Sequence, residues 1–246
     1  MKNSLTLEER TLTHRLISHD IFAFFGIMNT ELCTEIDETK KELLQAYLSH
    51  VYSTLRSIEQ LNNNYELYKM TPGDLREQLE KLVSFPPLKN VSYSLEVNSS
   101  FKSNPNVLYS ALYNLAKNSG RFIDKDQGKI SVSASEYSGE VPERVYTAEG
   151  TPTEGDFILL NVNDNGQGFP KDRPLKEFIK LGVSTKGNDS GFGLYYVALV
   201  CKFLRSHLTI DSEPGNTNIS IYHPLDLTKL PEIIPRKGLL ERIKFW

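Results

Sequence analysis

Asp164-Asn165-Gly166-Gln167-Gly168 closes a run of alternating apolar residues, and Ser190-Gly191-Phe192-Gly193-Leu194 follows further along the chain. Upstream, Asn114 and Asn118 are four residues apart, which places them on one face of a helix. A carboxylate can accept a hydrogen bond from a purine amino group, glycines let backbone N–H groups approach phosphate, and amide oxygens can bind a hard cation. The pattern therefore predicts a site for a magnesium nucleotide that is not built on a P-loop.

The composition is that of an ordinary globular protein. The 246 residues are 39% hydrophobic and 24% charged, with a formal net charge of -3. The chain lacks the basic excess that drives nucleic-acid binding. It also lacks the run of about 18 apolar residues that a membrane span needs, and its N-terminus is too polar for a signal peptide. We therefore expect a cytoplasmic protein without a membrane span, in which Cys33 and Cys201 are reduced thiols.

The chain divides near Thr71-Pro72-Gly73 into two predicted domains, residues 1–71 and 72–246. Before this point the apolar pattern is helical, and Thr6 and Glu9 form a capping box at the start of the first helix. A second helix is expected from about Lys40 to Tyr68. Two helices leave apolar faces uncovered, so a second copy of the hairpin would bury them in a four-helix bundle. The pattern predicts a homodimer.

The second domain has a mixed pattern of helices and strands. The polar stretch 138–155 is too long for a tight hairpin and is expected to be a mobile insertion, and residues 170–189, rich in lysine, glycine and proline, are expected to form a lid. Periodicity predicts helices over 105–122 and 193–204 and strands over 91–97, 129–137, 156–164, 207–210 and 217–223.

His19 is a candidate phosphate acceptor. It points away from the apolar face of the first predicted helix, at about 100° per residue. Asp20 follows it and could orient the ring or take its proton. On its own, however, this pattern favours a solvated surface histidine, because most exposed histidines on helices are only that. The apolar face consists of Ile17, Ile21, Phe24, Met28 and Leu32.

At this point the chain resembles the two-component sensor histidine kinases. Their H, N, G1, F and G2 boxes are similar to five segments here, in the same order: 18–20 (Ser-His-Asp), 114–119, 164–168, 184–186 (Ser-Thr-Lys) and 191–194. The resemblance implies an α+β protein, in which a dimerisation hairpin precedes an α/β sandwich of the GHKL (Bergerat) type. A mixed sheet would pack on helices, and the nucleotide would lie under a flexible lid.

The resemblance also implies roles for individual residues. Asn118 would coordinate Mg²⁺, with Asn114 supporting the phosphates of ATP. His19 would be the nucleophile and Asp20 its acid–base partner. The remaining cofactor-binding residues would be Lys117 and Arg121 as positive charges, Asp164, Gly166 and Gly168 at adenine, Gly191, Gly193 and Leu194 at the phosphates, and Thr185 and Lys186 from the lid.

The expected function is an ATP-dependent protein-histidine kinase that phosphorylates His19 and passes the phosphoryl group to an aspartate of a response-regulator receiver domain. A separate sensor protein is a possible further partner. Ala23 occupies a position where the family commonly has Thr or Asn, which argues against phosphatase activity. Two alternatives remain open: a catalytically impaired dimeric scaffold or phosphorelay protein, and a GHKL ATPase or protein kinase that does not use His19.

Overall fold

The computed structural model describes residues 67–85, 88, 90–124, 126–180, 183 and 193–227. The predicted helical hairpin lies almost wholly outside the described residues, so the hairpin, the dimer and the division into two domains stay predictions. None of the described helices is both long and apolar enough to cross a membrane.

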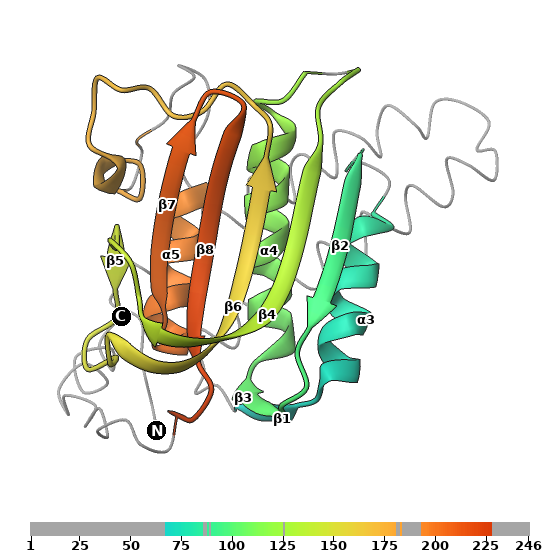
Figure 1. Ribbon diagram of the computed structural model, residues 1–246, viewed down its shortest axis with the longest axis vertical. Helices are drawn as coiled ribbons and strands as arrows, with labels where there is room; N and C mark the ends of the chain where they lie inside the picture. The colour runs from blue at the N-terminus through green and yellow to red at the C-terminus, as the bar shows by residue number, and fades with distance from the viewer. Residues whose placement is uncertain are drawn as a thin grey trace, which may run out of the picture.

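A six-stranded mixed sheet forms one layer of the domain (Figure 1). The first pair of strands, β2 and β4, is parallel, and every other neighbouring pair is antiparallel. Across the sheet the strands are β2 (Val91–Glu96), β4 (Ile130–Glu140), β6 (Glu154–Asp164), β8 (Asn216–Pro224), β7 (His207–Glu213) and β5 (Tyr146–Thr147).

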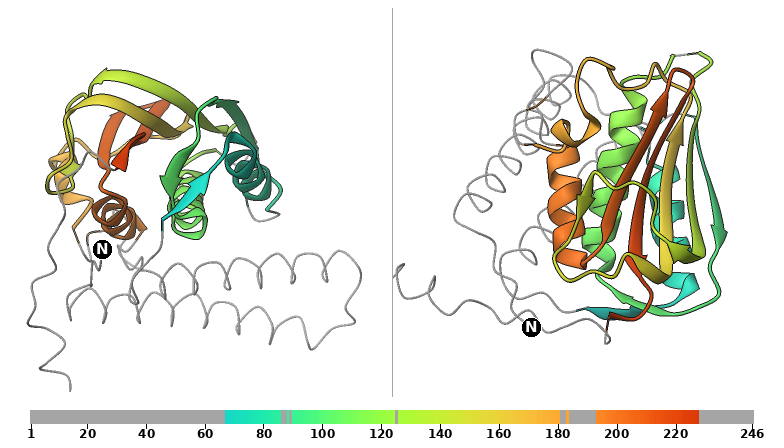
Figure 2. Two further views of the ribbon diagram at one scale, coloured as in Figure 1. Left: turned by 90° about the horizontal axis from the view of Figure 1, so that it is seen from below. Right: turned by 60° about the vertical axis from the view of Figure 1, so that its left-hand side comes forward.

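Three helices cover one face of this sheet: α3 (Pro72–Val83), α4 (Pro105–Gly120) and α5 (Gly193–Leu204) (Figure 2). A short ribbon of β1 (Tyr68–Met70) and β3 (Phe101–Ser103) lies at one end, and the turn η1 (Leu175–Glu177) follows β6. The α/β sandwich with a mixed sheet that the sequence predicted is therefore confirmed.

Local signals account for where the helices begin. Thr71 and Asp74 form a capping box at α3, in which the Asp74 N–H donates to Thr71 Oγ1 at 3.2 Å and the Thr71 N–H donates to Asp74 Oδ2 at 2.7 Å. Asn104 caps α4 by accepting from the Val107 N–H at 3.2 Å. Pro72 and Pro105 occupy the first helical positions, where a missing N–H costs nothing.

The alternation of side chains along β6 places its last residue, Asp164, on the helical side of the sheet. Ile158, Leu160 and Val162 are fully buried beneath the helices. Because side chains on a strand alternate between faces, Asp164 lies on the same face as these three residues. An acidic side chain at the end of an apolar stripe is thereby turned toward α4.

Two local expectations are wrong. The stretch 138–155 was expected to be a mobile insertion, but β4 extends to Glu140, β6 begins at Glu154, and β5 pairs with β7 at the sheet edge. The buried His207 bonds to Pro152 O through Nε2 at 2.7 Å, which holds the segment in place. Tyr68 was expected to end a helix, but it begins β1 because the 68–70 segment pairs with β3.

Candidate nucleotide site

The carboxylate of Asp164 is held by two donors. The residue is 5% exposed, Ser119 Oγ donates to Oδ2 at 2.6 Å, and the Gly166 N–H donates to Oδ1 at 2.9 Å. A buried carboxylate requires such partners. Each carboxylate oxygen has a second lone pair, so the group can accept a further hydrogen bond from a ligand.

Glycine is required at both glycine positions of the turn after β6. A Cβ on Gly166 would lie 2.8 Å from Asp164 Oδ1 and 2.8 Å from the Phe122 carbonyl oxygen, which is shorter than ordinary contact. Gly168 has a φ of +78°, in the left-handed region that disfavours side chains. The Gly215 N–H also donates to Gly166 O at 2.7 Å, so the β7–β8 turn supports this segment.

Asn118 and Gly193 are in direct contact, which brings the end of α4 to the beginning of α5. A Cβ on Gly193 would lie 2.7 Å from Asn118 Nδ2 and 2.9 Å from Oδ1. One helical turn earlier, Asn114 Nδ2 donates to Ser110 O at 2.8 Å. That bond fixes which way the Asn114 amide is turned.

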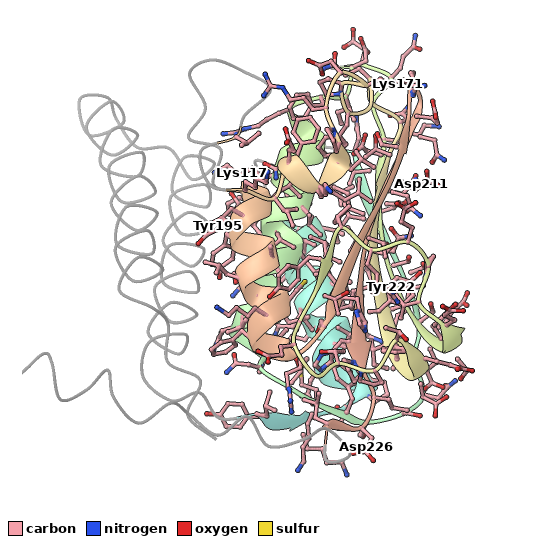
Figure 3. All side chains as sticks on the ribbon, turned by 90° about the vertical axis from the view of Figure 1, so that its left-hand side faces the viewer. Lys117, Lys171, Tyr195, Asp211, Tyr222 and Asp226 are labelled. Carbon is pink, nitrogen blue, oxygen red and sulfur yellow. The ribbon has the colours of Figure 1, made fainter. Side chains whose placement is uncertain are left out.

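A basic residue, Lys117, lies in the last turn of α4 next to Asn118. The Lys117 ammonium lies 5.8 Å from the centroid of the Tyr113 ring. The first turn of α5 as described contains no acidic residue, and the N-terminus of a helix carries a partial positive charge. Figure 3 shows Lys117 and Tyr195 on the helical side of the domain, opposite Asp211 on the sheet. The N-terminus of α5 is therefore suited to an anion, and Lys117 in the last turn of α4 adds a positive charge.

Residues 103–227, slightly more than half of the chain, match the family described as histidine kinase-, DNA gyrase B-, and HSP90-like ATPase. The chain belongs to this family. The match covers α4, β6, α5 and the strands between and after them, so the contacts of the candidate nucleotide site all lie within it.

Individual relatives are sensor kinases. The chain is 23% identical to the sensory histidine kinase/phosphatase NtrB of Azospirillum brasilense over 254 residues, which is 90% of this chain and 62% of NtrB. It is 31% identical to the probable sensor histidine kinase TcrY of Mycobacterium tuberculosis over 104 residues, 38% of this chain and 22% of TcrY. The chain thus spans less than two thirds of the length of these relatives. Their names agree with the resemblance that the motifs indicated.

A solved structure shares the fold. The crystal structure of full-length ShkA in complex with AMPPNP has a TM-score of 0.51 at 18% sequence identity, covering 89% of this chain and 46% of that chain.

The side chains at this site fit the magnesium nucleotide of an ATPase of this family. Within the described residues, no group of three or more His, Cys, Asp and Glu could hold a metal ion. Mg²⁺ commonly takes few protein ligands and completes its shell with phosphate oxygens and water. An amide oxygen on Asn118 beside a helix N-terminus suits that mode of binding.

The predicted site residues divide into three groups. The structure brings together Asn114, Asn118, Asp164 and the glycines at 166, 168 and 193, with Lys117 at the same end of α4. Arg121 follows α4 and is exposed, and Leu194 is half-buried against the core. His19, Asp20, Thr185, Lys186 and Gly191 lie outside the described residues.

Sequence reasoning missed the supporting residues. Ser119 was not identified as the donor to Asp164, and neither was the Phe122 carbonyl that excludes a side chain at Gly166. The position of Ser119, next to Asn118 on the predicted helix, was a usable signal for the first. Nothing in the sequence pattern indicates a backbone carbonyl, because every residue has one.

Proposed function

We propose that this protein is an ATP-dependent protein-histidine kinase that phosphorylates His19 and passes the phosphoryl group to an aspartate of a response-regulator receiver domain. Two observations carry the proposal together. Asn118 contacts Gly193, and the buried carboxylate of Asp164 accepts two hydrogen bonds. This arrangement presents a base-reading acid, an amide ligand and a helix N-terminus at one end of the domain.

In the proposed complex Asp164 accepts a hydrogen bond from the adenine amino group, with Gly166 and Gly168 leaving room for the base. Asn118 is a ligand of Mg²⁺, and Asn114 supports the phosphates. The backbone at the start of α5, together with Gly191 and Leu194, faces the phosphate chain. Lys117 and Arg121 contribute positive charge, and Thr185 and Lys186 belong to the lid.

The proposed chemistry needs little from the protein beyond positioning and charge stabilisation. A nitrogen of the His19 imidazole attacks the γ-phosphorus, the bond to the β–γ bridging oxygen breaks, and ADP leaves. Asp20 accepts the proton that the ring loses. The phosphoryl group then moves from the imidazole to a carboxylate oxygen of the receiver aspartate, the N–P bond breaks, and Asp20 returns the proton to the ring, which regenerates neutral His19.

The partners are inferred from the same resemblance. The relatives named sensor histidine kinases support a response regulator as the acceptor and a homodimer as the working state. A separate protein is a possible source of the signal. NtrB is named a kinase and phosphatase, whereas Ala23 in this chain argues for kinase activity without efficient removal of phosphate from the regulator.

The test is incubation of the full chain with γ-labelled ATP and Mg²⁺. The kinase proposal expects label on the protein that is acid-labile and alkali-stable, and that is absent from the His19→Gln variant. Asp164→Asn should show much less label at limiting ATP because nucleotide binds more weakly, although its His19 is intact.

The same experiment separates the alternatives. Nucleotide binding that is undetectable in the unaltered chain supports a scaffold or phosphorelay protein and contradicts the kinase. Release of phosphate from ATP that is unchanged in His19→Gln supports an ATPase or a kinase that does not use this residue.

A further inference from the structure

A second contact between α4 and α5 lies deeper in the domain than the Asn118–Gly193 contact. The hydroxyl oxygens of Tyr196 and Ser110 are 2.5 Å apart, and the two residues are 2% and 0% exposed. Ser110 Oγ also lies 2.8 Å from Val107 O, to which it donates. Since a serine hydroxyl has one hydrogen, Tyr196 is then the donor and Ser110 the acceptor.

The two contacts are aligned along the same pair of helices. Ser110, Asn114 and Asn118 are spaced by four residues and share one face of α4. On α5, Tyr196 lies three residues after Gly193, so it belongs to the next turn of the same helix. The hydroxyl pair therefore joins the two helices on the face that carries both asparagines.

The outer contact cannot by itself set the position of α5. Gly193 has no side chain that could interlock with Asn118. The buried Tyr196–Ser110 hydrogen bond, by contrast, is directional and short. If α5 slid or rotated along α4, this hydrogen bond would break while both hydroxyl groups stayed buried, which costs free energy.

We propose that Tyr196 is a positioning residue for the magnesium and phosphate part of the site. Its hydroxyl holds the N-terminus of α5 against Asn118, so that the asparagine amide and the helix N-terminus keep a fixed position relative to each other. This inference rests on the proposed nucleotide function. The adenine part of the site does not depend on α5, because Asp164, Ser119 and Gly166 belong to β6, α4 and the turn after β6.

The independence of the two parts gives the inference a specific test. In the full chain, the affinities of Mg²⁺·AMPPNP and of adenosine are measured by calorimetry for the unaltered protein and for Tyr196→Phe. We expect the affinity for Mg²⁺·AMPPNP to fall about fivefold to tenfold, and the affinity for adenosine to stay within about twofold, since one buried hydrogen bond is lost.

Two controls distinguish positioning from general stability. Tyr93→Phe removes another tyrosine hydroxyl bond, to Glu80 at 2.8 Å between β2 and α3, and should leave both affinities unchanged. Ser110→Ala should reproduce the effect of Tyr196→Phe, and the double variant should bind about as weakly as either single variant, because both changes remove the same hydrogen bond.

Each outcome decides the question. Equal losses for adenosine and Mg²⁺·AMPPNP, or a lowered melting temperature with unchanged affinities, would show that Tyr196 only stabilises the fold and would overturn the inference. Failure of the unaltered chain to bind Mg²⁺·AMPPNP would overturn the proposed function and this inference together. Normal binding by the unaltered chain and by Tyr196→Phe would overturn the inference alone.

Discussion

Replacing Gly193 by alanine adds one methyl group at the contact between α4 and α5. The new carbon would lie 2.7 Å from Asn118 Nδ2, 2.9 Å from Oδ1 and 3.2 Å from Cγ. Ordinary van der Waals contact begins at about 3.4 Å, so the Asn118 amide must move by about 0.7 Å or the helix must shift by a similar amount.

The expected effect on folding is small, and the expected effect on magnesium binding is large. Alanine is favoured over glycine in a helix by about 1 kcal/mol, whereas overpacking costs about 1–3 kcal/mol, so the fold should lose at most about 2 kcal/mol. Mg²⁺ demands oxygen ligands at about 2.0–2.1 Å in near-octahedral geometry. An amide displaced by about 0.7 Å cannot meet that demand, and loss of such a charged contact lowers affinity by about tenfold or more.

The assay is calorimetric titration of the full chain with AMPPNP in Mg²⁺ and again in EDTA, together with a thermal melt. Gly73→Ala is the matched control, because Gly73 also lies in the first turn of a helix and its new carbon would meet only Thr71 Oγ1 at an ordinary 3.5 Å. We expect the gain in affinity that Mg²⁺ provides to shrink in Gly193→Ala and to persist in Gly73→Ala. An undiminished gain in Gly193→Ala, with an unchanged melting temperature, would refute the reasoning.

Of three further predictions, two concern the adenine side of the site and one concerns the buried His223 of β8. Asp164→Asn replaces a carboxylate oxygen, which accepts a hydrogen bond, by an NH₂ group that faces either the Ser119 hydroxyl or the Gly166 N–H. ATP affinity should therefore fall about tenfold or more. Unchanged ATP affinity in a competition titration would contradict the role of this residue. Gly166→Ala should lower the melting temperature as well as ATP affinity, because its methyl group would meet the Phe122 carbonyl at 2.8 Å, and a stable variant would show that the turn can move. Complete burial lowers the pKa of His223 to about 4, so between about pH 6.5 and pH 4 the unfolded state binds a proton that the folded state excludes. The free energy of unfolding should therefore fall by up to roughly 3 kcal/mol as the pH is lowered from above 6.5 toward 4. Urea unfolding between pH 7 and pH 4 should show a smaller loss in His223→Gln, and an equal loss would assign the pH dependence to other groups.

The elements of the fold were predictable because their signals are local. The helix at 193–204 was predicted with both ends as observed, and the strands predicted at 91–97 and 156–164 match β2 and β6 within two residues. The segment 138–155 was mispredicted because its pairing partner, β7, lies about 60 residues away, and no local pattern reports a partner at that distance.

The candidate site was predictable in its members but not in their contacts. Asn114, Asn118, Asp164 and Gly193 were identified from spacing and residue type. The residues that hold them, such as Ser119 at Asp164 and Tyr196 at Ser110, are joined across 45 and 86 residues of sequence. Such pairs depend on how α4, α5 and β6 pack together.

By itself the sequence determined the alternation that turns Asp164 toward the helices and the four-residue spacing that aligns the asparagines of α4. Both follow from backbone geometry, in which side chains repeat every two residues on a strand and about every 3.6 on a helix. Only the tertiary structure decided that Gly193 lies against Asn118, that Ser119 and Gly166 bond to Asp164, and that a tyrosine hydroxyl joins the two helices. These contacts arise from the dense packing of elements distant in the chain, where the position of each side chain depends on all of its neighbours.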